Sequence, residues 1–559
     1  MSTFRHHLLS KKTIYLWSFL LTLVLVLATV AGLHFRDENV EPKLPPVAKH
    51  ADIPSQALTT YAESLAITAP ADLSTYKDST CAPLAKDWVA QENQQVGAPY
   101  TTKFWQNLDI ANPTGSVLWL DKSSVSCGDK VTIHASSYNT WLPNYEKGPR
   151  TFQALRIGWY QGSGARVVWS AASFNLKRQR IPFATSATRM IETNWKPTTQ
   201  FEVGTDWKPG FYLIISISPS GTVEGSAPLI VRSPLGSSPL VLVHSTMTWS
   251  AYNTFGGRSL YVGPGATPIA RRAERSRVSS MDRPITGSGA EHIHRDAISL
   301  VQFMEKQGLS VDHITDTDLD QWPSITKSYN GIVYSGHAEY WTRRQLEATI
   351  AARNAGVNVA ILGGNTAYWQ TRVQASPIGN YRRVIEYRDA TEDPVINPSQ
   401  VTLQFSDKRV NSPGWLLTAG QKSGVHVYGN IQVVNTPPWL NIPTGTVLRG
   451  WASESEIERR SNTSSEPTNV HVMLSGTMTL RDPKTATMAI PMHPTQESVW
   501  YTTPSGAAVF NAGISMWSCD LMPTCSISTV DSATRDSLQS ITGQILTLWG
   551  QKEIGKVLK

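Results

Sequence analysis

The sequence is poor in cysteine and in charge, and both shortages narrow the classes of protein it can be. Four cysteines occur in 559 residues, and none has the C-x-x-C spacing of a structural zinc site. Charged residues make up 17% and hydrophobic residues 40%, so the chain is not of the disordered type. The net charge of +7 is not concentrated, and we find no nucleic-acid-binding motif. We therefore expect a folded protein with no nucleic acid partner.

Long hydrophobic runs are scarce too, and one stands out, because Ile14–Phe35 contains no Asp, Glu, Lys or Arg. About 20 apolar residues are enough to cross a bilayer core. Arg5, Lys11 and Lys12 precede the run, and positive charge is retained on the cytoplasmic side. Residues 1–35 are therefore predicted to be a cytoplasmic tip and a transmembrane helix, giving a single-pass protein of the cell membrane with an extracytoplasmic body. A cleaved signal peptide is the alternative, although its apolar region is usually shorter.

The four cysteines suggest disulfides, because an even number of cysteines is typical of proteins that fold in an oxidising compartment. Cys519 and Cys525 are close enough in sequence to close a small loop. A bond between Cys81 and Cys127 would tie the segment after the stalk to the first folded domain. Four cysteines allow three pairings, so the connectivity stays open at this stage.

The hydrophobic pattern changes twice after the apolar run. Residues 36–85 include a polar, proline-rich stretch typical of an extended stalk or linker. In residues 86–234, short apolar–polar alternations bounded by Gly, Pro, Asn and Asp predict an antiparallel β-sandwich. In residues 235–559, apolar runs such as LVLVHS and VNVAILGG alternate with helical stretches. That alternation predicts a doubly wound α/β domain.

Polar and aromatic residues follow three of the predicted α/β strands. Ligands bind at the carboxyl ends of strands in open α/β sheets, so we expect these residues to share one rim. His337 and Glu339 are the candidates for proton transfer. The candidates for substrate contact are Trp249, Tyr252, Asn253, Trp341, Asn365 and Trp369.

The tyrosines and glutamates of this set are hard oxygen ligands, which suit a hard cation such as ferric iron. A purely structural interpretation of the motif SGHAEYW is also open. In that case Tyr340 and Trp341 pack under the helix that follows, and Glu339 stabilises the N-terminus of that helix by its charge.

Five motifs occur in a fixed order in the second half of the chain. They are STMTWSAYNTFGGRSLY, QGLSVDHITDTDLD, YSGHAEYW, ILGGNTAYW and GAAVFNAGISMW. Together they resemble the C-terminal domain of the N,N-dimethylformamidase large (beta) subunit family, over residues 239–548. The resemblance implies a fold similar to that of class I glutamine amidotransferases. It also implies hydrolysis of a small amide by a mononuclear iron that two tyrosines and a glutamate hold.

Carried over to this chain, the resemblance implies Tyr340 and Tyr368 as iron ligands. Either Glu386 or Glu339 would be the glutamate ligand. These assignments come from the resemblance and not from residue spacing.

Two functions are therefore expected. The first is a surface-anchored, metal-dependent hydrolase of a C–N bond, such as that of a small amide, in which His337 or Glu339 moves protons. The second is a non-catalytic protein of the cell envelope that binds a glycan or peptide polymer through an aromatic rim of Trp249, Trp341 and Trp369. The metal content of the purified protein distinguishes the two.

Overall fold

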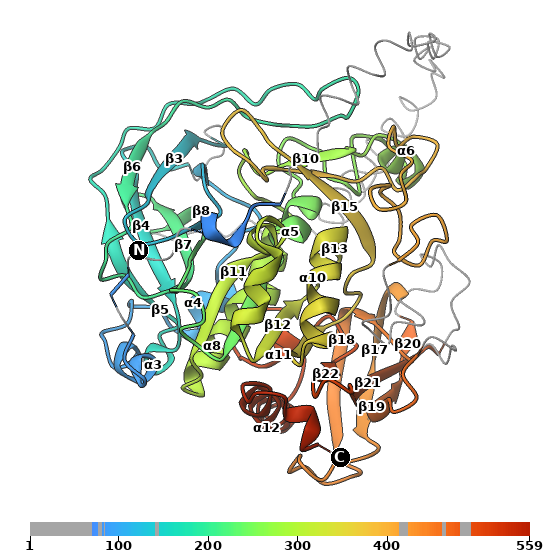
Figure 1. The fold of residues 1–559 in the computed structure, drawn as a ribbon. Helices are drawn as coiled ribbons and strands as arrows, with labels where there is room; N and C mark the ends of the chain where they lie inside the picture. The colour runs from blue at the N-terminus through green and yellow to red at the C-terminus, as the bar shows by residue number, and fades with distance from the viewer. Residues whose placement is uncertain are drawn as a thin grey trace, which may run out of the picture. The chain divides into compact units, whose positions relative to one another are not determined.

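The fold is taken from a computed structural model, drawn in Figure 1. It describes residues 70–76, 81–82, 84–139, 145–412, 423–460, 466–480 and 493–558. Contacts between residues gather positions 65–559 into one compact unit. The domain boundaries predicted at residues 85 and 234 stay predictions.

Two small sheets pack face to face in the first part of this unit. The smaller sheet has the order β1 (Ser116–Leu120), β3 (Lys130–Ser137), β6 (Thr199–Glu202). The larger has the order β2 (Ser124–Val125), β8 (Val223–Val231), β7 (Gly210–Ile217), β4 (Thr151–Ile157), β5 (Ala165–Ser170). Alternate side chains of both sheets meet in one buried cluster, which holds Leu118 and Ile133 against Phe152 and Ile214. Burial of this apolar area stabilises the pair of sheets.

A ten-stranded mixed sheet forms the centre of the unit. Its first five strands are parallel: β11 (Val311–Thr315), β9 (Leu240–His244), β12 (Gly331–Gly336), β14 (Asn358–Gly363) and β22 (Ala508–Asn511). The others are antiparallel: β21 (Thr495–Thr502), β19 (His471–Thr477), β17 (Ser423–Val433) and β18 (Val447–Ile457), with β20 (Thr479–Leu480) beside β17. The continuous apolar runs of β9 and β14 reflect burial on both faces.

Helices cover both faces of the parallel strands. One face packs against α9 (Asp316–Gln321) and α10 (Arg343–Asn354), through side chains such as Leu319 and Leu346. The opposite face packs against α8 (Ser299–Lys306) and α12 (Ser532–Trp549), through side chains such as Leu300 and Leu538.

The predicted fold class is wrong. The part of the chain that the structure describes is mostly β-sheet with few helices, and it is not a doubly wound α/β fold. The physical reason lies between β14 and β22. A doubly wound sheet would join these neighbours by a helical crossover, but here the chain leaves the sheet and builds antiparallel strands from residues 423–502 before it returns as β22. The prediction assumed that the continuous apolar runs of β9, β12 and β14 were typical of the whole sheet, but the antiparallel strands do not share that pattern.

The predicted membrane anchor also needs correction. Among the residues that the structure describes, no helix is long and apolar enough to cross a membrane. The segment 14–35, on which the prediction rested, lies outside those residues. We therefore withdraw the prediction that this is a single-pass protein of the cell membrane.

A fourth sheet, of four strands, lies beside the ends of the parallel strands. Its order is β10 (Val278–Ser280), β16 (Arg383–Ile385), β15 (Trp369–Gln374), β13 (Tyr340–Thr342). The pairing of β13 with β15 sets Tyr340 opposite Trp369. This sheet therefore fixes two aromatic residues of the predicted rim relative to each other.

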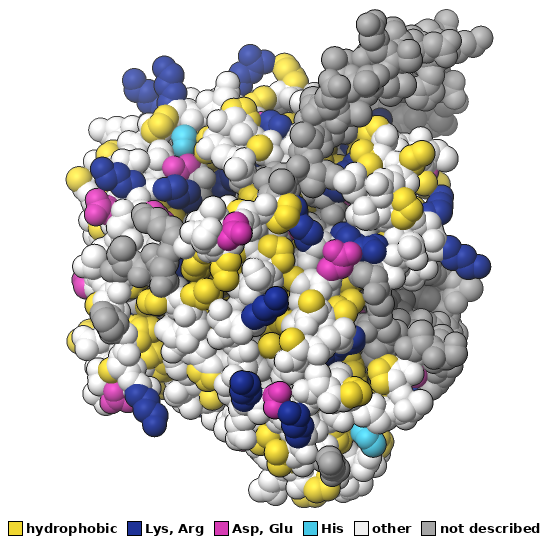
Figure 2. Space-filling model, in the orientation of Figure 1, with side chains coloured by type: hydrophobic (Ala, Val, Ile, Leu, Met, Phe, Trp, Pro, Cys, Tyr) yellow, Lys and Arg dark blue, Asp and Glu magenta, His cyan; other side chains and the backbone are white. Residues whose placement is uncertain are grey.

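Surface charge is dispersed on the face drawn in Figure 2. Lys and Arg side chains there are scattered in small groups, some of them beside Asp or Glu side chains. The described part of that face offers no continuous basic patch of the kind that attracts a polyanion.

Both suggested disulfides are present. Cys81 is bonded to Cys127 and Cys519 to Cys525, across sequence separations of 46 and 6 residues. No free cysteine remains. The first bond joins the segment before α3 (Trp88–Asn93) to the turn before β3, and its sulfurs lie in the core that the two small sheets share.

Removing the two disulfides should destabilise the fold unequally. The entropy lost on closing a loop in the unfolded chain grows with loop length, which gives about 4 kcal/mol for the Cys81–Cys127 bond and about 2 kcal/mol for Cys519–Cys525. We therefore expect the double variant Cys81→Ala/Cys127→Ala to lower the free energy of unfolding more than Cys519→Ala/Cys525→Ala does. Urea denaturation of both variants measures the difference. Equal losses would show that loop closure does not govern the effect.

Candidate functional site

The ends of β12 and β14 approach each other so closely that only glycine fits. A Cβ on Gly363 would lie 1.6 Å from the carbonyl oxygen of Gly336, and Gly336 has a φ of +54°. Glycine adopts that conformation without steric cost. The two strands are therefore brought together where the segments carrying His337, Glu339 and Asn365 begin.

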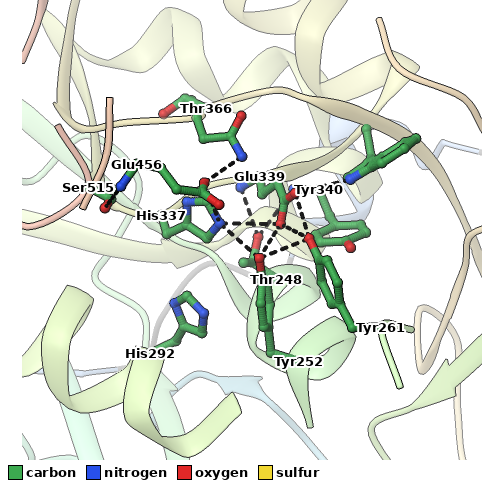
Figure 3. Close-up of polar contacts among 12 residues, drawn as sticks. Thr248, Tyr252, Tyr261, His292, His337, Glu339, Tyr340, Thr366, Glu456 and Ser515 are labelled. Carbon is green, nitrogen blue, oxygen red and sulfur yellow. Dashed lines mark hydrogen bonds and ion pairs between the residues drawn. The ribbon is translucent and has the colours of Figure 1, made fainter. Parts of the chain in front are cut away.

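Glu339 is the centre of a buried cluster of oxygen atoms (Figure 3). Tyr261 donates to its carboxylate, with Oη 2.6 Å from Oε1 and 2.5 Å from Oε2. The Oη of Tyr252 lies 2.8 Å from Glu339 Oε2 and 2.8 Å from the Oη of Tyr261. Trp369 donates its indole N–H to Oε1 at 3.0 Å. Two phenols and an indole thus hold one carboxylate in place.

The helix α5 (Thr246–Tyr252) supplies Tyr252 and also fixes the backbone that carries Glu339. The hydroxyl oxygen of Thr248 accepts the N–H groups of Glu339 and Tyr340, at 3.1 and 3.2 Å. Thr248 and Tyr252 are four residues apart, so they lie on one face of the helix. This spacing aims both side chains at the segment after β12.

His337 lies between two carboxylates. Its Nε2 is 3.2 Å from Glu339 Oε2 and 3.3 Å from Glu456 Oε2. Its Nδ1 is 3.1 Å from the carbonyl oxygen of Gly364, so Nδ1 carries a proton and donates it there. Burial opposes the charged imidazolium, but the Glu456 and Glu339 carboxylates outweigh it and raise the pKa of His337 to about 9.

The two carboxylates that flank His337 are in different surroundings. Burial acts to raise the pKa of Glu339, but the His337 imidazole and the Arg388 guanidinium outweigh it and hold that pKa well below its usual range. Burial raises the pKa of Glu456, to which Asn365 donates an N–H at 2.5 Å. Carboxyl pairs whose pKa values are pushed apart commonly divide the acid and base roles of a site.

Arg388 places a permanent positive charge on the other side of Glu339. Its guanidinium carbon lies 3.8 Å from the ring centroid of Tyr261 and 4.8 Å from that of Trp369, and it donates to the Tyr340 hydroxyl. Its φ of +60° is unusual for a residue with a side chain. Such strained residues cluster at functional sites, because the surrounding structure must hold them there.

Several buried polar atoms in this region lack a hydrogen-bond partner in the part of the chain that the structure describes. Two of them are the Nε–H of Arg388, a donor, and the Oδ1 of Asn365, an acceptor. Buried polar atoms are nearly always paired, so unpaired atoms point to a missing water or ligand. An amide group carries an acceptor and, in many cases, a donor that would satisfy both.

The structure brings together many of the residues proposed from the sequence. His337, Glu339, Tyr340, Tyr252, Asn365 and Trp369 all belong to this cluster. Tyr368 lies beside it, with its ring edge-on to Trp369 at 5.0 Å. Burial and the charge of Glu339 raise the pKa of Tyr368 to about 12.

Four of the proposed residues have other surroundings. The ring of Trp249 packs near His244 and Phe211, and the ring of Trp341 packs on Tyr334 at 4.5 Å. Asn253 holds a turn, since its amide bonds backbone groups of Phe255, Pro284 and Thr286. Glu386 is buried, and its Oε1 accepts the backbone N–H of Arg388 at 3.2 Å.

Three members of the cluster were missed in the sequence: Tyr261, Arg388 and Glu456. Tyr261 ends the motif STMTWSAYNTFGGRSLY, and Arg388 lies two residues after Glu386, so both were within reach of the motifs. Glu456 is on β18, in the antiparallel half of the large sheet, where no parallel-strand pattern indicates a site.

The donor atoms of the cluster fit a hard cation. Two phenolic protons serve four oxygen–oxygen contacts of 2.5 to 2.8 Å among Tyr252, Tyr261 and Glu339. Oxygen ligands at right angles about 2 Å from an octahedral cation are themselves about 2.8 Å apart. No group of three or more His, Cys, Asp or Glu side chains that could hold a metal occurs among the residues the structure describes. Any ligand set at this site therefore depends on the tyrosines.

A buried carboxylate held by phenols, beside a histidine and a second carboxylate, defines a site suited to proton transfer. A family model described as "N,N-dimethylformamidase beta subunit-like, C-terminal" matches residues 151–530. The chain belongs to this family, as its motifs indicated.

Other comparisons add nothing to this assignment. A search of curated proteins found no match. Among solved structures, the chain is matched to a cycloisomaltooligosaccharide glucanotransferase of Paenibacillus sp. complexed with cycloisomaltoheptaose. The match has 9% identity and a TM-score of 0.17, over 72% of this chain and 71% of that one. A TM-score this low carries no argument about fold or function.

Proposed function

We propose that this protein hydrolyses the C–N bond of a small amide at the Glu339 cluster. The observation that carries the proposal is the convergence of the Tyr252 and Tyr261 oxygens on Glu339, with His337 between Glu339 and Glu456. Membership of the N,N-dimethylformamidase beta subunit-like family supports the reaction class.

Tyr252, Tyr261 and Glu339 would hold a hard cation such as iron, which when bound would polarise the amide carbonyl. The sequence resemblance implied Tyr340, Tyr368 and either Glu386 or Glu339, so this set keeps Glu339 and differs in both tyrosines. The hydroxyl of Tyr340 accepts a hydrogen bond from the Arg388 side chain, and the carboxylate of Glu386 accepts the backbone N–H of Arg388.

Proton transfer is assigned to His337 and Glu456. Amide hydrolysis needs a proton for the departing amine and a base for the attacking water. His337 Nε2 faces both carboxylates and carries the mobile proton, because Nδ1 is fixed to the Gly364 carbonyl. Glu456 is the group with which His337 exchanges that proton.

Arg388 and Asn365 orient the substrate. The unpaired Nε–H of Arg388 donates to the amide oxygen, and the unpaired Oδ1 of Asn365 accepts from the nitrogen side or from the attacking water. Both groups are fixed before substrate binds, so they lose little entropy on binding.

The second expected function, binding of an envelope polymer, is not favoured. It relied on a rim of Trp249, Trp341 and Trp369. The exposed fractions of Trp249 and Trp341 are 1% each, so neither ring can stack on a polymer at the surface.

The double variant Tyr252→Phe/Tyr261→Phe tests the cation-binding role. Phenylalanine keeps the packing of both rings and removes only the donor oxygens, so the variant should fold but lose stoichiometric metal. Tyr334→Phe is the control, because Tyr334 is a buried tyrosine outside the cluster and its hydroxyl bonds Thr349. Metal content and visible absorption are measured after growth with iron and purification without chelator. Equal metal in the wild-type protein and the double variant would contradict the assignment.

A further inference from the structure

A cavity lies on another face of α5, away from the Glu339 cluster. It is lined by Thr246, Trp249, Ser250 and Asn253 of α5 and its C-terminal end, by Trp119 of β1, and by Ala227 of β8. Thr248 and Tyr252, which face the cluster, lie on a different side of the same helix. The cavity therefore separates the two small sheets from the helix that positions Tyr252.

Two buried hydrogen-bond donors of residues that line this cavity have no partner among the residues that the structure describes. They are the indole N–H groups of Trp119 and Trp249, whose side chains are 2% and 1% exposed. An indole can only donate, so whatever completes these bonds must carry an acceptor.

The cavity wall also contains a buried positive charge without a counterion. Arg283 is 2% exposed and bonds backbone oxygens of Asn253, Phe255 and Ser280. Among the residues that the structure describes, no carboxylate is paired with it, and burial lowers the pKa of Arg283 to about 9. Arg382, another lining residue, is by contrast neutralised by Asp282 at 2.7 Å. The other N–H groups of Arg283 donate to the Arg258 carbonyl and the Ser279 hydroxyl, so Arg283 acts on a nearby anion only through its charge.

Most of the remaining lining is apolar, with Lys122 and Ser123 as its polar members, and the space is small. Leu118, Leu120, Pro228 and Ile285 contribute to the wall, and the cavity measures about 60 Å³. One water needs about 10–15 Å³ of such space, so the cavity holds a molecule of about five heavy atoms.

We infer that this cavity is a binding site for a small monocarboxylate with a short apolar tail. The tail lies among the aliphatic side chains, and the carboxylate accepts the two indole N–H groups within the field of Arg283. The inference rests on residues outside the Glu339 cluster and holds whether or not that cluster hydrolyses an amide.

Titration of the purified full chain with propionate tests the inference. Calorimetry should give saturable binding with a Kd of about 1 mM or tighter. The uncharged isostere propionamide should bind at least tenfold more weakly. Absence of saturable propionate binding, or equal binding of propionamide, would overturn the inference.

Two variants locate the site. Trp119→Phe/Trp249→Phe removes both donors and keeps the rings, and Ala227→Val fills the cavity without removing a polar group. Each should weaken propionate binding at least tenfold. Trp88→Phe is the control, since its buried indole N–H bonds Ser310 away from the cavity, and it should bind as the wild type does. If the first variant fails to fold, Ala227→Val decides, and unchanged binding in Ala227→Val would overturn the assignment.

Discussion

Glu339→Gln is expected to lower kcat/KM for amide hydrolysis by about 10²–10³-fold or more, the scale seen when a preorganised electrostatic group is removed. Glutamine fills the same space, but it replaces one carboxylate oxygen with a donor. Tyr252, Tyr261, Trp369 and His337 all approach the carboxylate of Glu339, so an amide N–H there would face another donor. The variant also loses one of the two carboxylate charges that raise the pKa of His337.

Glu347→Gln is the control for this variant. Glu347 is on α10, at the surface, and pairs with Arg343 one turn earlier. Steady-state kinetics on the wild-type protein and both variants, after circular dichroism has shown equal folding, measure the effect. Activity of Glu339→Gln within tenfold of the wild type would show that the cluster is not the reaction centre.

Glu305→Gln is expected to lower the free energy of unfolding by about 3–5 kcal/mol, because breaking one partner of a buried ion pair leaves the other charge uncompensated. Glu305 is on α8 and receives two hydrogen bonds from Arg156 of β4, at 2.5 and 3.1 Å. The side chains are 5% and 0% exposed. The pair joins the five-stranded sheet to the helix that covers the large sheet.

Glu347→Gln is also the control for Glu305→Gln, because it breaks the exposed ion pair between Glu347 and Arg343. A surface pair of this kind contributes about 0.3–0.5 kcal/mol, so its loss should be close to the error of the measurement. Urea denaturation compares the two variants with the wild type. A loss below about 1 kcal/mol in Glu305→Gln would show that this contact does not hold the sheet to the helix.

The parallel strands could be predicted because burial on both faces leaves a direct mark on the sequence. LVLVHS and VNVAILGG read as buried runs, and the residues just after them entered the site by the rule for strand ends. The antiparallel strands β17 to β21 carry no comparable mark. The predicted doubly wound class failed because those strands, and not another helical crossover, complete the sheet.

Part of the site could be predicted from the sequence for a related reason. His337 and Glu339 lie within three residues of the end of β12, and Tyr252 is eight residues after β9, so the rule for strand ends reached all three. Tyr261 is in a loop after α5 that has no periodicity, and Glu456 comes from β18, which is antiparallel. Their contribution depends on tertiary contacts that residue spacing does not record.

The tryptophans show that residue type and position after a strand do not by themselves determine what a side chain contacts. Trp249 and Trp369 both follow predicted strands, yet one is buried against Phe211 and the other donates to Glu339. Sequence position gives the end of the sheet at which a side chain lies, and packing decides which way the side chain points.

The central claim is that the Glu339 cluster hydrolyses a small amide, and release of amine measures it directly. The full chain is grown with iron, purified without chelator, and incubated with N,N-dimethylformamide and a panel of other small formamides and acetamides. We expect amine release that is proportional to bound metal and is lost in Glu339→Gln. Metal-loaded, folded protein that releases no amine from any amide of the panel would contradict the account.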